Sequence, residues 1–216
     1  MFELATGPRR KLLDAALHVI RAQGYAGTSV DDICREAGVT KGSFFHHFKS
    51  KDELAVAATE HWSGVTGNLF AGAPFQSIAD PRERVLAYID FRAALIKANR
   101  ELPEFTCLLG TMVQEAFETH PTIREACNRS LLEHANTVEQ DLAEAKRLYV
   151  PKASWEPRGV ALFTQAAIQG AFILAKAQQN PAAAIEVIAH LRNYVASLLP
   201  SAERATRSTA AAKRRR

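Results

Sequence analysis

Apolar residues recur at helical spacing along almost all of this 216-residue chain, and they almost nowhere alternate with polar residues as in a β-strand. In residues 9–23, for example, Leu13, Leu17 and Ile20 share one face, and Gly24 marks the end of the helix. The same pattern predicts further helices at about residues 29–37, 40–48, 50–68, 81–97, 103–119, 121–148, 157–178 and 181–199. We therefore expect an all-α protein of about nine helices, four short ones followed by five longer ones.

Polar residues mark several helix starts. Ser29 and Ser50 are each followed three positions later by an acidic residue, which is the spacing of a capping box. Glycine and proline gather in residues 64–74, so we expect the fourth helix to end near Asn68. This stretch is the first plausible joint between two parts of the chain.

Composition excludes several protein classes. With 47% hydrophobic and 23% charged residues, the chain is neither disordered nor fibrous. Its three cysteines (Cys34, Cys107 and Cys127) lack metal-binding spacing, which indicates a reducing compartment without a disulfide framework or structural zinc. The N-terminus lacks the order of a secretion signal, and residues 160–175 are predicted to be too short and too polar to span a membrane. We expect a cytoplasmic, soluble protein with no membrane partner.

The positive charge of the chain lies mainly in its last residues. Residues 200–216 carry six Lys or Arg against one Glu, a net charge of +5, whereas the other 199 residues carry 21 Lys or Arg against 22 Asp or Glu. We predict that 200–216 form a basic flexible tail. This tail either adds salt-sensitive contacts to phosphates or is a solvated terminus or an expression remnant.

The most informative segment is residues 29–51, SVDDICREAGVTKGSFFHHFKSK. It predicts two short helices joined by a turn at Gly38, the layout of a helix-turn-helix. Phe44 and Phe48 lie on one side of the second helix, which leaves a polar stripe free to face DNA. Residues 35–51 carry a net charge of +3, and Lys51 lies in the first turn of the next helix, where a phosphate is favoured. The alternative is a small helical subdomain with a solvated basic rim.

The first 56 residues also resemble a known family. The segments LLDAALHVIRAQGYAGTSVDDIC and GVTKGSFFHHFKSKDEL occur in the order typical of the TetR family of bacterial transcription regulators. The C-terminal half resembles that family in architecture, and residues 105–115 (FTCLLGTMVQE) weakly resemble a C-x-x-G-x-x-x-Q-E segment of one subgroup. The resemblance implies a DNA-binding domain in residues 1–55, with three helices including the helix-turn-helix. It also implies a larger helical effector-binding and dimerisation domain in residues 56–199.

The resemblance implies a set of DNA contacts. Thr40, Lys41 and Ser43 would read bases, with Gly42 allowing a close approach of the backbone. His47 and Lys51 would hold phosphates, and Thr28 would cap the second helix and reach another phosphate. Phe45 stands where the family usually has tyrosine, so it would offer an apolar contact in place of a hydroxyl.

The last two helices are expected to pair across a homodimer. Residues 160–177 are apolar nearly all round, so this helix needs neighbours on two sides, although a single-chain core would also explain it. The residues assigned to the dimer interface are Ala167, Gly170, Ala171, Ile188, Leu191, Val195 and Leu198.

A small-molecule effector is expected between the middle helices. Such pockets are apolar with a few polar groups, and the candidates are Trp62, Phe91, Arg92, Cys107, Gln114, His134, Gln169 and Phe172. Each also has a structural interpretation, because Trp62 and Phe172 suit a core, His134 suits a satisfied core histidine, and Cys107 is favoured as a core thiol.

No catalytic motif is present: the sequence has no GxSxG, HExxH, phosphate loop or nucleotide fingerprint. We therefore predict a protein that is not an enzyme and uses no cofactor or metal. The expected function is a homodimeric repressor that a small molecule releases from a near-palindromic double-stranded DNA operator. The alternatives are a DNA-associated interaction protein of the same fold without an inducer, and a helical module whose helix-turn-helix is vestigial.

Overall fold

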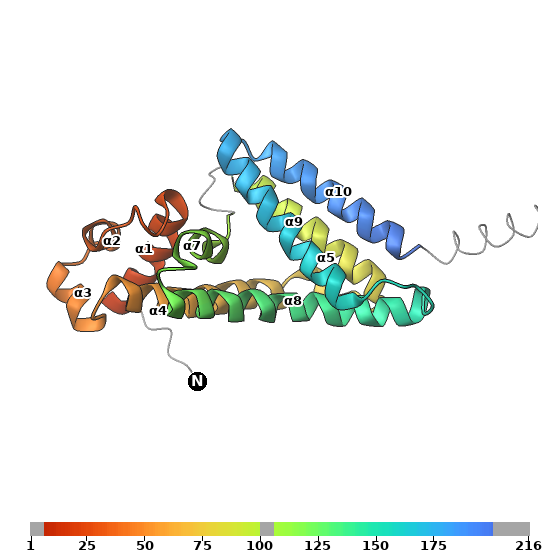
Figure 1. Cartoon of the computed structure of the whole chain (residues 1–216), viewed down its shortest axis with the longest axis horizontal. Coiled ribbons are helices and arrows are strands. Elements are labelled where there is room, and N and C mark those ends of the chain that lie inside the picture. The colour runs from red at the N-terminus through yellow and green to blue at the C-terminus, as the bar shows by residue number, and fades with distance from the viewer. Residues whose placement is uncertain (1–6, 100–105, 201–216) are drawn as a thin grey trace, which may run out of the picture. The chain divides into compact units, whose positions relative to one another are not determined.

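The computed structural model describes residues 7–99 and 106–200, and all regular structure in these ranges is helical (Figure 1). This confirms the predicted all-α class. The α-helices of the described ranges, with one 3-10 helix, are α1 Pro8–Gln23, α2 Val30–Ala37, α3 Lys41–His47, α4 Lys51–Ala71, η1 Pro74–Ser77, α5 Pro81–Ala98, α7 Leu108–Ala116, α8 Pro121–Tyr149, α9 Pro157–Gln178 and α10 Ala182–Leu198.

Two predicted helices have clearly different bounds in the structure. The fourth helix continues past Gly64 and Gly67 to Ala71 and ends at Gly72, because Phe70 near its end is buried. Helix α7 begins at Leu108 rather than near 103, and residues 103–105 of the predicted helix lie outside the described residues. All but the first residue of the predicted basic tail also lies outside them.

Local sequence explains where the helices begin. Ser29 accepts a hydrogen bond from the backbone N–H of Asp32, whose carboxylate accepts one in return, so the predicted capping box is present. Ser50 caps α4 in the same way, but Glu53 bonds the backbone N–H of Lys49 rather than that of Ser50. The second box is therefore formed on one side only.

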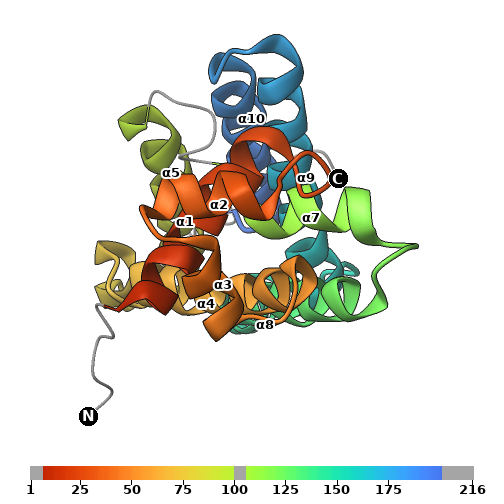
Figure 2. The same ribbon diagram turned by 90° about the vertical axis from the view of Figure 1, so that its left-hand side faces the viewer.

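The described residues divide into two compact units. The first unit comprises residues 7–72, 99 and 106–134, and the second comprises residues 73–98 and 135–200. The predicted domain boundary at residue 55 falls inside the long helix α4, and α7 with the first half of α8 belongs to the same unit as α1, α2 and α3. Figure 2 views this first group of helices from the front.

A continuous apolar core holds the first unit together. Leu12, Ile20, Ile33, Phe44 and Leu54 are fully buried in it, and they come from α1, α2, α3 and α4. Buried residues of α7 and α8 belong to the same core. Helices α1 to α4 and the segment 106–134 therefore share one hydrophobic core.

In the second unit α9 lies against α10, and α10 lies against α5 (Figure 1). Helix α9 has 22 residues and a window of mean hydropathy 1.4, so by length and composition alone it is able to cross a membrane. The sequence prediction on length and polarity was wrong in this respect. Of that window, 44% is buried inside the protein.

Replacing Phe44 by alanine is expected to lower the free energy of unfolding by about 3–5 kcal/mol, because it empties a fully buried aromatic site. Urea denaturation followed by circular dichroism measures this loss. The matched control is Phe45→Ala, since Phe45 is 53% exposed and its removal opens no cavity. Equal losses in the two variants would contradict the assignment of Phe44 as the anchor of α3.

Candidate nucleic-acid interface

Helix α3 is held in place by a turn at its start and two rings at its back. Gly38 has φ +63°, a left-handed conformation that favours glycine, and it ends α2. The Thr40 hydroxyl caps α3 by accepting the N–H of Ser43 at 3.2 Å. Phe44 and Phe48, with ring centroids 5.9 Å apart, are buried as predicted. The predicted helix-turn-helix is therefore present.

The predicted DNA contacts on and beside α3 remain on its outer side. None of them is buried: Thr40, Lys41, Gly42 and Phe45 are exposed, and Ser43 and His47 are half-buried. The His47 ring lies edge-on to the ring of His46, with centroids 4.9 Å apart. The outer side of α3 thus offers a hydroxyl, an ammonium, an apolar ring and an imidazole within two helical turns.

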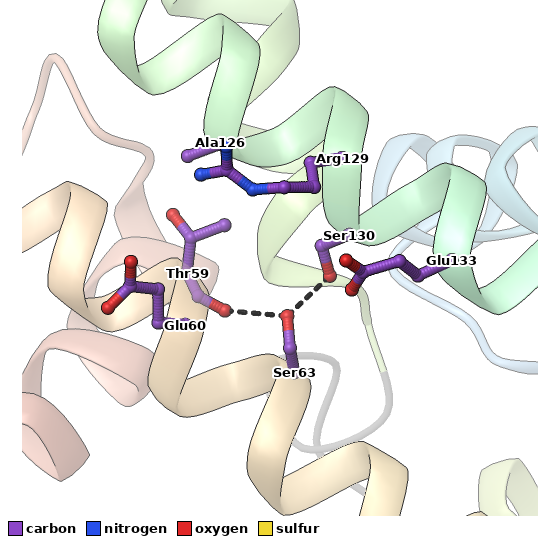
Figure 3. Close-up of a pocket in the computed structure, with 7 residues that line it drawn as sticks. All are labelled: Thr59, Glu60, Ser63, Ala126, Arg129, Ser130 and Glu133. Atoms are coloured by element: carbon purple, nitrogen blue, oxygen red, sulfur yellow. Dashed lines mark hydrogen bonds between the residues drawn. The ribbon is translucent and has the colours of Figure 1, made fainter.

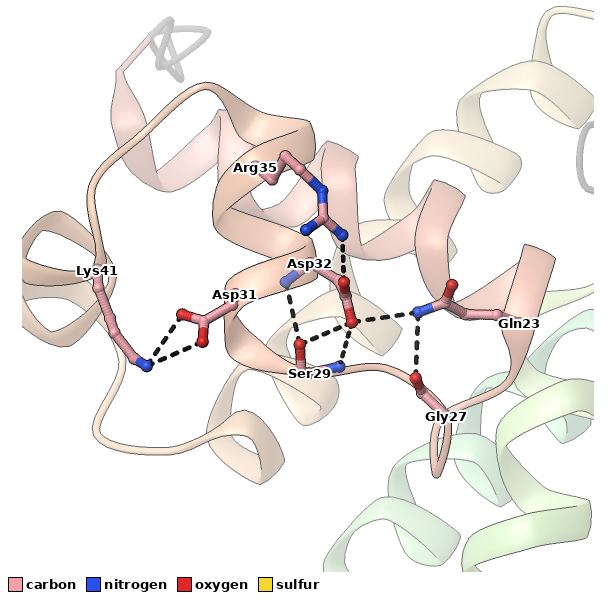
Figure 4. Close-up of polar contacts among 7 residues, drawn as sticks. All are labelled: Gln23, Gly27, Ser29, Asp31, Asp32, Arg35 and Lys41. Carbon is pink, nitrogen blue, oxygen red and sulfur yellow. Dashed lines mark hydrogen bonds and ion pairs between the residues drawn. The ribbon is translucent and has the colours of Figure 1, made fainter.

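Lys41 is oriented by the preceding helix. Its ammonium lies 2.9 Å from the carboxylate of Asp31 on α2, and both side chains are more than half exposed (Figure 4). An exposed ion pair of this kind contributes only about 0–1 kcal/mol. Lys41 is therefore able to exchange Asp31 for another partner at small cost.

Two predicted phosphate contacts are placed differently. Thr28 is buried, and its hydroxyl donates to the carbonyl of Gly24 at 2.5 Å, so Ser29 and not Thr28 caps α2. The Lys51 ammonium donates to the carbonyls of Tyr25 and Thr28 at 3.0 and 2.9 Å and lies 4.2 Å from the Tyr25 ring centroid. Both residues thus hold the α1–α2 turn (residues 24–29). The role of Lys51 was missed from the sequence because its carbonyl partners lie 23 and 26 positions away, whereas the partner of Thr28 is only four positions away.

Asp32 is the centre of the polar contacts at the start of α2 (Figure 4). Its carboxylate accepts hydrogen bonds from the hydroxyl and backbone N–H of Ser29, and it pairs with Arg35 one turn later. Gln23, at the end of α1, also reaches it at 3.4 Å and donates to the carbonyl of Gly27 at 3.1 Å. The bonds from Ser29, followed by Arg35, lower the pKa of Asp32 from 3.8 to about 2.

The eight residues predicted for an effector pocket are divided between the two units, so neither unit brings all of them together. The first unit contains Trp62, Cys107, Gln114 and His134, and the second contains Phe91, Arg92, Gln169 and Phe172.

In the first unit these side chains have structural partners. The guanidinium of Arg21 lies 5.0 Å from the Trp62 ring centroid, and Trp62 also packs against the apolar core. The ring of His134 lies 4.9 Å from that of Phe70. Gln114 is exposed and donates to the carbonyl four residues before it at 2.7 Å. Trp62 and His134 therefore fit the structural interpretation.

In the second unit, Arg92 donates to the hydroxyl of Tyr88 at 3.1 Å. The ring centroid of Phe91 lies 5.6 Å from that of Phe75 in η1. Phe172 is buried and Gln169 is half-buried. Phe172 is therefore a core residue of its own unit.

The cysteines also behave as packing residues. Cys34 and Cys127 are buried, and Cys107 is half-buried against the core of the first unit. Burial, with a smaller effect of Cys107, raises the pKa of Cys127 to about 12. Cys127 therefore stays a neutral thiol at physiological pH, and the packing of Cys107 against the core supports its prediction as a core thiol.

A pocket of about 200 Å³ lies between α4 and α8 in the first unit (Figure 3). Ser63 donates to the carbonyl of Thr59 at 2.9 Å, so the 2.5 Å contact between Ser63 and Ser130 uses the proton of Ser130. The pocket includes none of the eight predicted residues, and most of its lining is polar: Thr59, Glu60, Ser63, Ala126, Arg129, Ser130 and Glu133.

The predicted dimer residues lie mostly inside their own unit. Ala171, Ile188, Leu191 and Val195 are already buried within the second unit of the single chain, so their assignment to a dimer interface stays an untested prediction. Ala167, Gly170 and Leu198 are half-buried. The large apolar side chains that remain exposed on α9 and α10 are Leu162, Phe163, Ile173, Leu174 and Tyr194.

Two of these exposed residues, Phe163 and Ile173, belong to a regular pattern along α9. Phe163, Ala166, Gly170, Ile173 and Ala177 follow one another at spacings of three and four residues, the heptad pattern of helices that pack side by side. We name this set the outer face of α9.

Comparison with known proteins agrees with this geometry. The family model "Bacterial regulatory proteins, tetR family" matches residues 12–58, and "Transcriptional regulator LmrA/YxaF-like, C-terminal domain" matches residues 81–190. The second match covers most of the C-terminal half, where the sequence alone showed a resemblance in architecture and a weak one in residues 105–115.

Individual relatives and structures are similar as well. The repressor DhaR of Mycobacterium sp. (strain GP1) is 25% identical over 81% of this chain and 85% of its own length. A regulatory protein TetR from Rhodobacter sphaeroides shares the fold with a TM-score of 0.77 at 22% identity, covering 86% of this chain and 97% of that one. FadR from Bacillus subtilis in complex with stearoyl-CoA has a TM-score of 0.65 at 20% identity, covering 89% and 97%.

Acid is expected to weaken the start of α2 through Asp32. Because the folded-state pKa of Asp32 is about 2, below its usual 3.8, its contribution to stability is present above about pH 4 and is lost as the pH falls toward 2. Thermal unfolding of the protein and of Asp32→Asn between pH 2 and 6 measures this effect, and the difference between the two should shrink toward pH 2. Asp31→Asn, which leaves the capping box intact, is the control; a constant Asp32→Asn difference would contradict the prediction.

Proposed function

Because the chain belongs to the TetR family of bacterial transcriptional regulators, we propose that it is a homodimeric repressor of a near-palindromic operator and that a small-molecule effector releases it. The observation that carries this proposal is the outer side of α3, where polar and basic side chains are exposed while Phe44 fixes the helix from behind. A cytoplasmic location follows from the proposed access to chromosomal DNA.

Base reading is assigned to Thr40, Lys41 and Ser43 at the start of α3. A helix that lies in the major groove presents its N-terminal residues to base edges, and Gly42 keeps the backbone open beside them. Phe45 offers an apolar surface for a thymine methyl or a sugar, and His47 is placed for a phosphate. Lys51 has one remaining N–H for a phosphate, whereas Thr28 acts on DNA only through the turn that it holds.

The homodimer is assigned to the outer face of α9, with Leu162, Leu174 and Tyr194 beside it. Heptad spacing suits two helices that cross at a shallow angle, and Ala166 and Gly170 allow their backbones to approach. A hypothetical Cβ at Gly170 meets no atom within 4 Å, so this position is open in the single chain. A two-fold dimer would present two α3 helices about 34–36 Å apart, one turn of DNA.

The effector is assigned to the larger C-terminal region. FadR, which has the same fold, binds stearoyl-CoA, and DhaR is named a repressor. The effector must bind the DNA-free conformation more tightly, and a coupling of about 1–3 kcal/mol changes DNA affinity about 5–150-fold.

Fluorescence anisotropy with DNA that flanks the gene itself, beside a shuffled duplex near physiological salt, tests the proposal. Saturable binding at least about a thousandfold tighter than to the shuffled duplex supports a specific regulator. Equal, salt-sensitive binding to both contradicts a site at this locus. A specific complex that no compound in a metabolite collection releases favours the alternative, an interaction protein without an inducer.

Ser43→Ala is expected to change base preference at one position in each half-site, because a hydroxyl that contacts a base edge is lost. Selection of sites from a random duplex pool measures the preference. Lys49→Ala is the comparison, since this exposed lysine should affect only phosphate attraction, weaken all sequences alike and lower the salt slope by about one. A uniform loss of affinity in Ser43→Ala would remove Ser43 from the base-reading set.

Ile173→Asp is expected to dissociate the dimer, because it places a charge on the outer face of α9, where desolvation is unfavourable. Light scattering coupled to size exclusion measures the mass. Leu148→Asp on α8 is the matched control, since Leu148 is exposed to a similar extent outside the proposed interface. A dimer that survives Ile173→Asp places the interface elsewhere.

A further inference from the structure

The α1–α2 turn is contacted by a helix far away in sequence. The carboxylate of Glu115, near the end of α7, accepts a hydrogen bond from the backbone N–H of Ala26 at 2.7 Å. The two residues lie 89 positions apart, and both belong to the first unit. Glu115 thus satisfies a turn N–H that no helical carbonyl reaches.

Gly24 makes room for this carboxylate. A Cβ at this position would lie 2.4 Å from an oxygen of Glu115, and the φ of Gly24 is +84°, where side chains are strained. Glycine here therefore ends α1 and also lets the carboxylate reach the turn. This gives a role to Glu115, the last residue of the C-x-x-G-x-x-x-Q-E segment.

A second contact comes from the junction of α7 and α8. The His120 ring lies edge-on to the Tyr25 ring at 5.3 Å, and its Nε2 lies 3.8 Å from the carboxylate of Asp52. The Tyr25 hydroxyl donates to the same carboxylate. Lys51 of α4 donates to the carbonyls of Tyr25 and Thr28 in the same turn. The turn is therefore held both by α4 and by α7 with its junction to α8.

We infer that Glu115 is a positioning residue for DNA recognition. It touches no residue of α3 in the contacts described above, but it fixes the turn that leads into Ser29, the cap of α2, and α2 leads directly into α3. A hydrogen bond between a turn N–H and a side-chain oxygen is directional, so it fixes the position of the turn relative to α7. Glu115 therefore sets how the helix-turn-helix sits on α7, and DNA affinity depends on that placement. The inference rests on the DNA binding of the family and is independent of the proposed dimer and effector.

The test compares Glu115→Ala, Glu115→Gln and the control Glu118→Ala. Glutamine keeps an oxygen that accepts the Ala26 N–H, whereas alanine removes it. Glu118 lies exposed three positions after Glu115, and its replacement by alanine gives the same change in charge. The probes are a duplex selected from a random pool by the wild-type protein and a shuffled duplex of the same composition. Hydrogen exchange of the Ala26 amide and the melting temperature are recorded for each variant.

We expect Glu115→Ala to lose about tenfold in affinity for the selected duplex, with unchanged binding of the shuffled duplex, unchanged base preference and faster exchange at Ala26. Glu115→Gln should stay within about twofold of the wild type, as should Glu118→Ala. The inference is overturned if Glu115→Ala binds like Glu118→Ala, if glutamine is as harmful as alanine, or if affinity for both duplexes falls together with the melting temperature. A wild-type protein that selects no duplex would instead contradict the proposed function.

Discussion

The burial of the Phe44 ring is the contact on which the DNA-binding surface depends. Helix α3 has only seven residues, and a helix of that length is unstable in water on its own. It exists because Phe44 enters the core built by α1, α2 and α4, where it meets residues such as Leu12, Ile33 and Leu54. Phe48 extends this contact at the end of α3, under the guanidinium of Arg9 at 5.3 Å. Every outward side chain of α3 takes its direction from these two rings.

Features that depend on neighbouring residues could be predicted from the sequence. The helix-turn-helix, the caps at Ser29 and Ser50 and the burial of Cys34 all follow from spacings of a few residues. The end of α4 was missed because Gly64 and Gly67 each cost the helix only about 1 kcal/mol, a cost that packing on its other face, including the buried Phe70, offsets. The low helix propensity of glycine predicts an end near Asn68, whereas tertiary packing extends the helix to Ala71.

Features that depend on distant partners could not be predicted. Lys51 looked like a free cation at a helix start, yet its ammonium bonds two carbonyls of a turn that is closed by other helices. Helix α9 is apolar on every side, so periodicity indicates two covered faces without saying which one the chain covers itself. The structure separates them, with Ala171 inward and Ile173 outward two positions apart. The residues of an effector pocket could not be predicted for the same reason, because a core and an apolar pocket produce the same spacing of apolar residues.

The neighbouring rings of Phe44 and Phe45 also limit how this protein can diverge. One is buried and the next is exposed, and each residue turns a helix by about 100°. Deleting one residue between Gly38 and Phe44 would rotate the anchor out of the core and turn the outward residues away from DNA. If α3 reads bases as proposed, new operator preferences are accessible by exchanging exposed side chains such as Lys41 without disturbing the core. Insertions and deletions in this segment are not expected to be tolerated, because they would unfold α3 and remove its specificity with it.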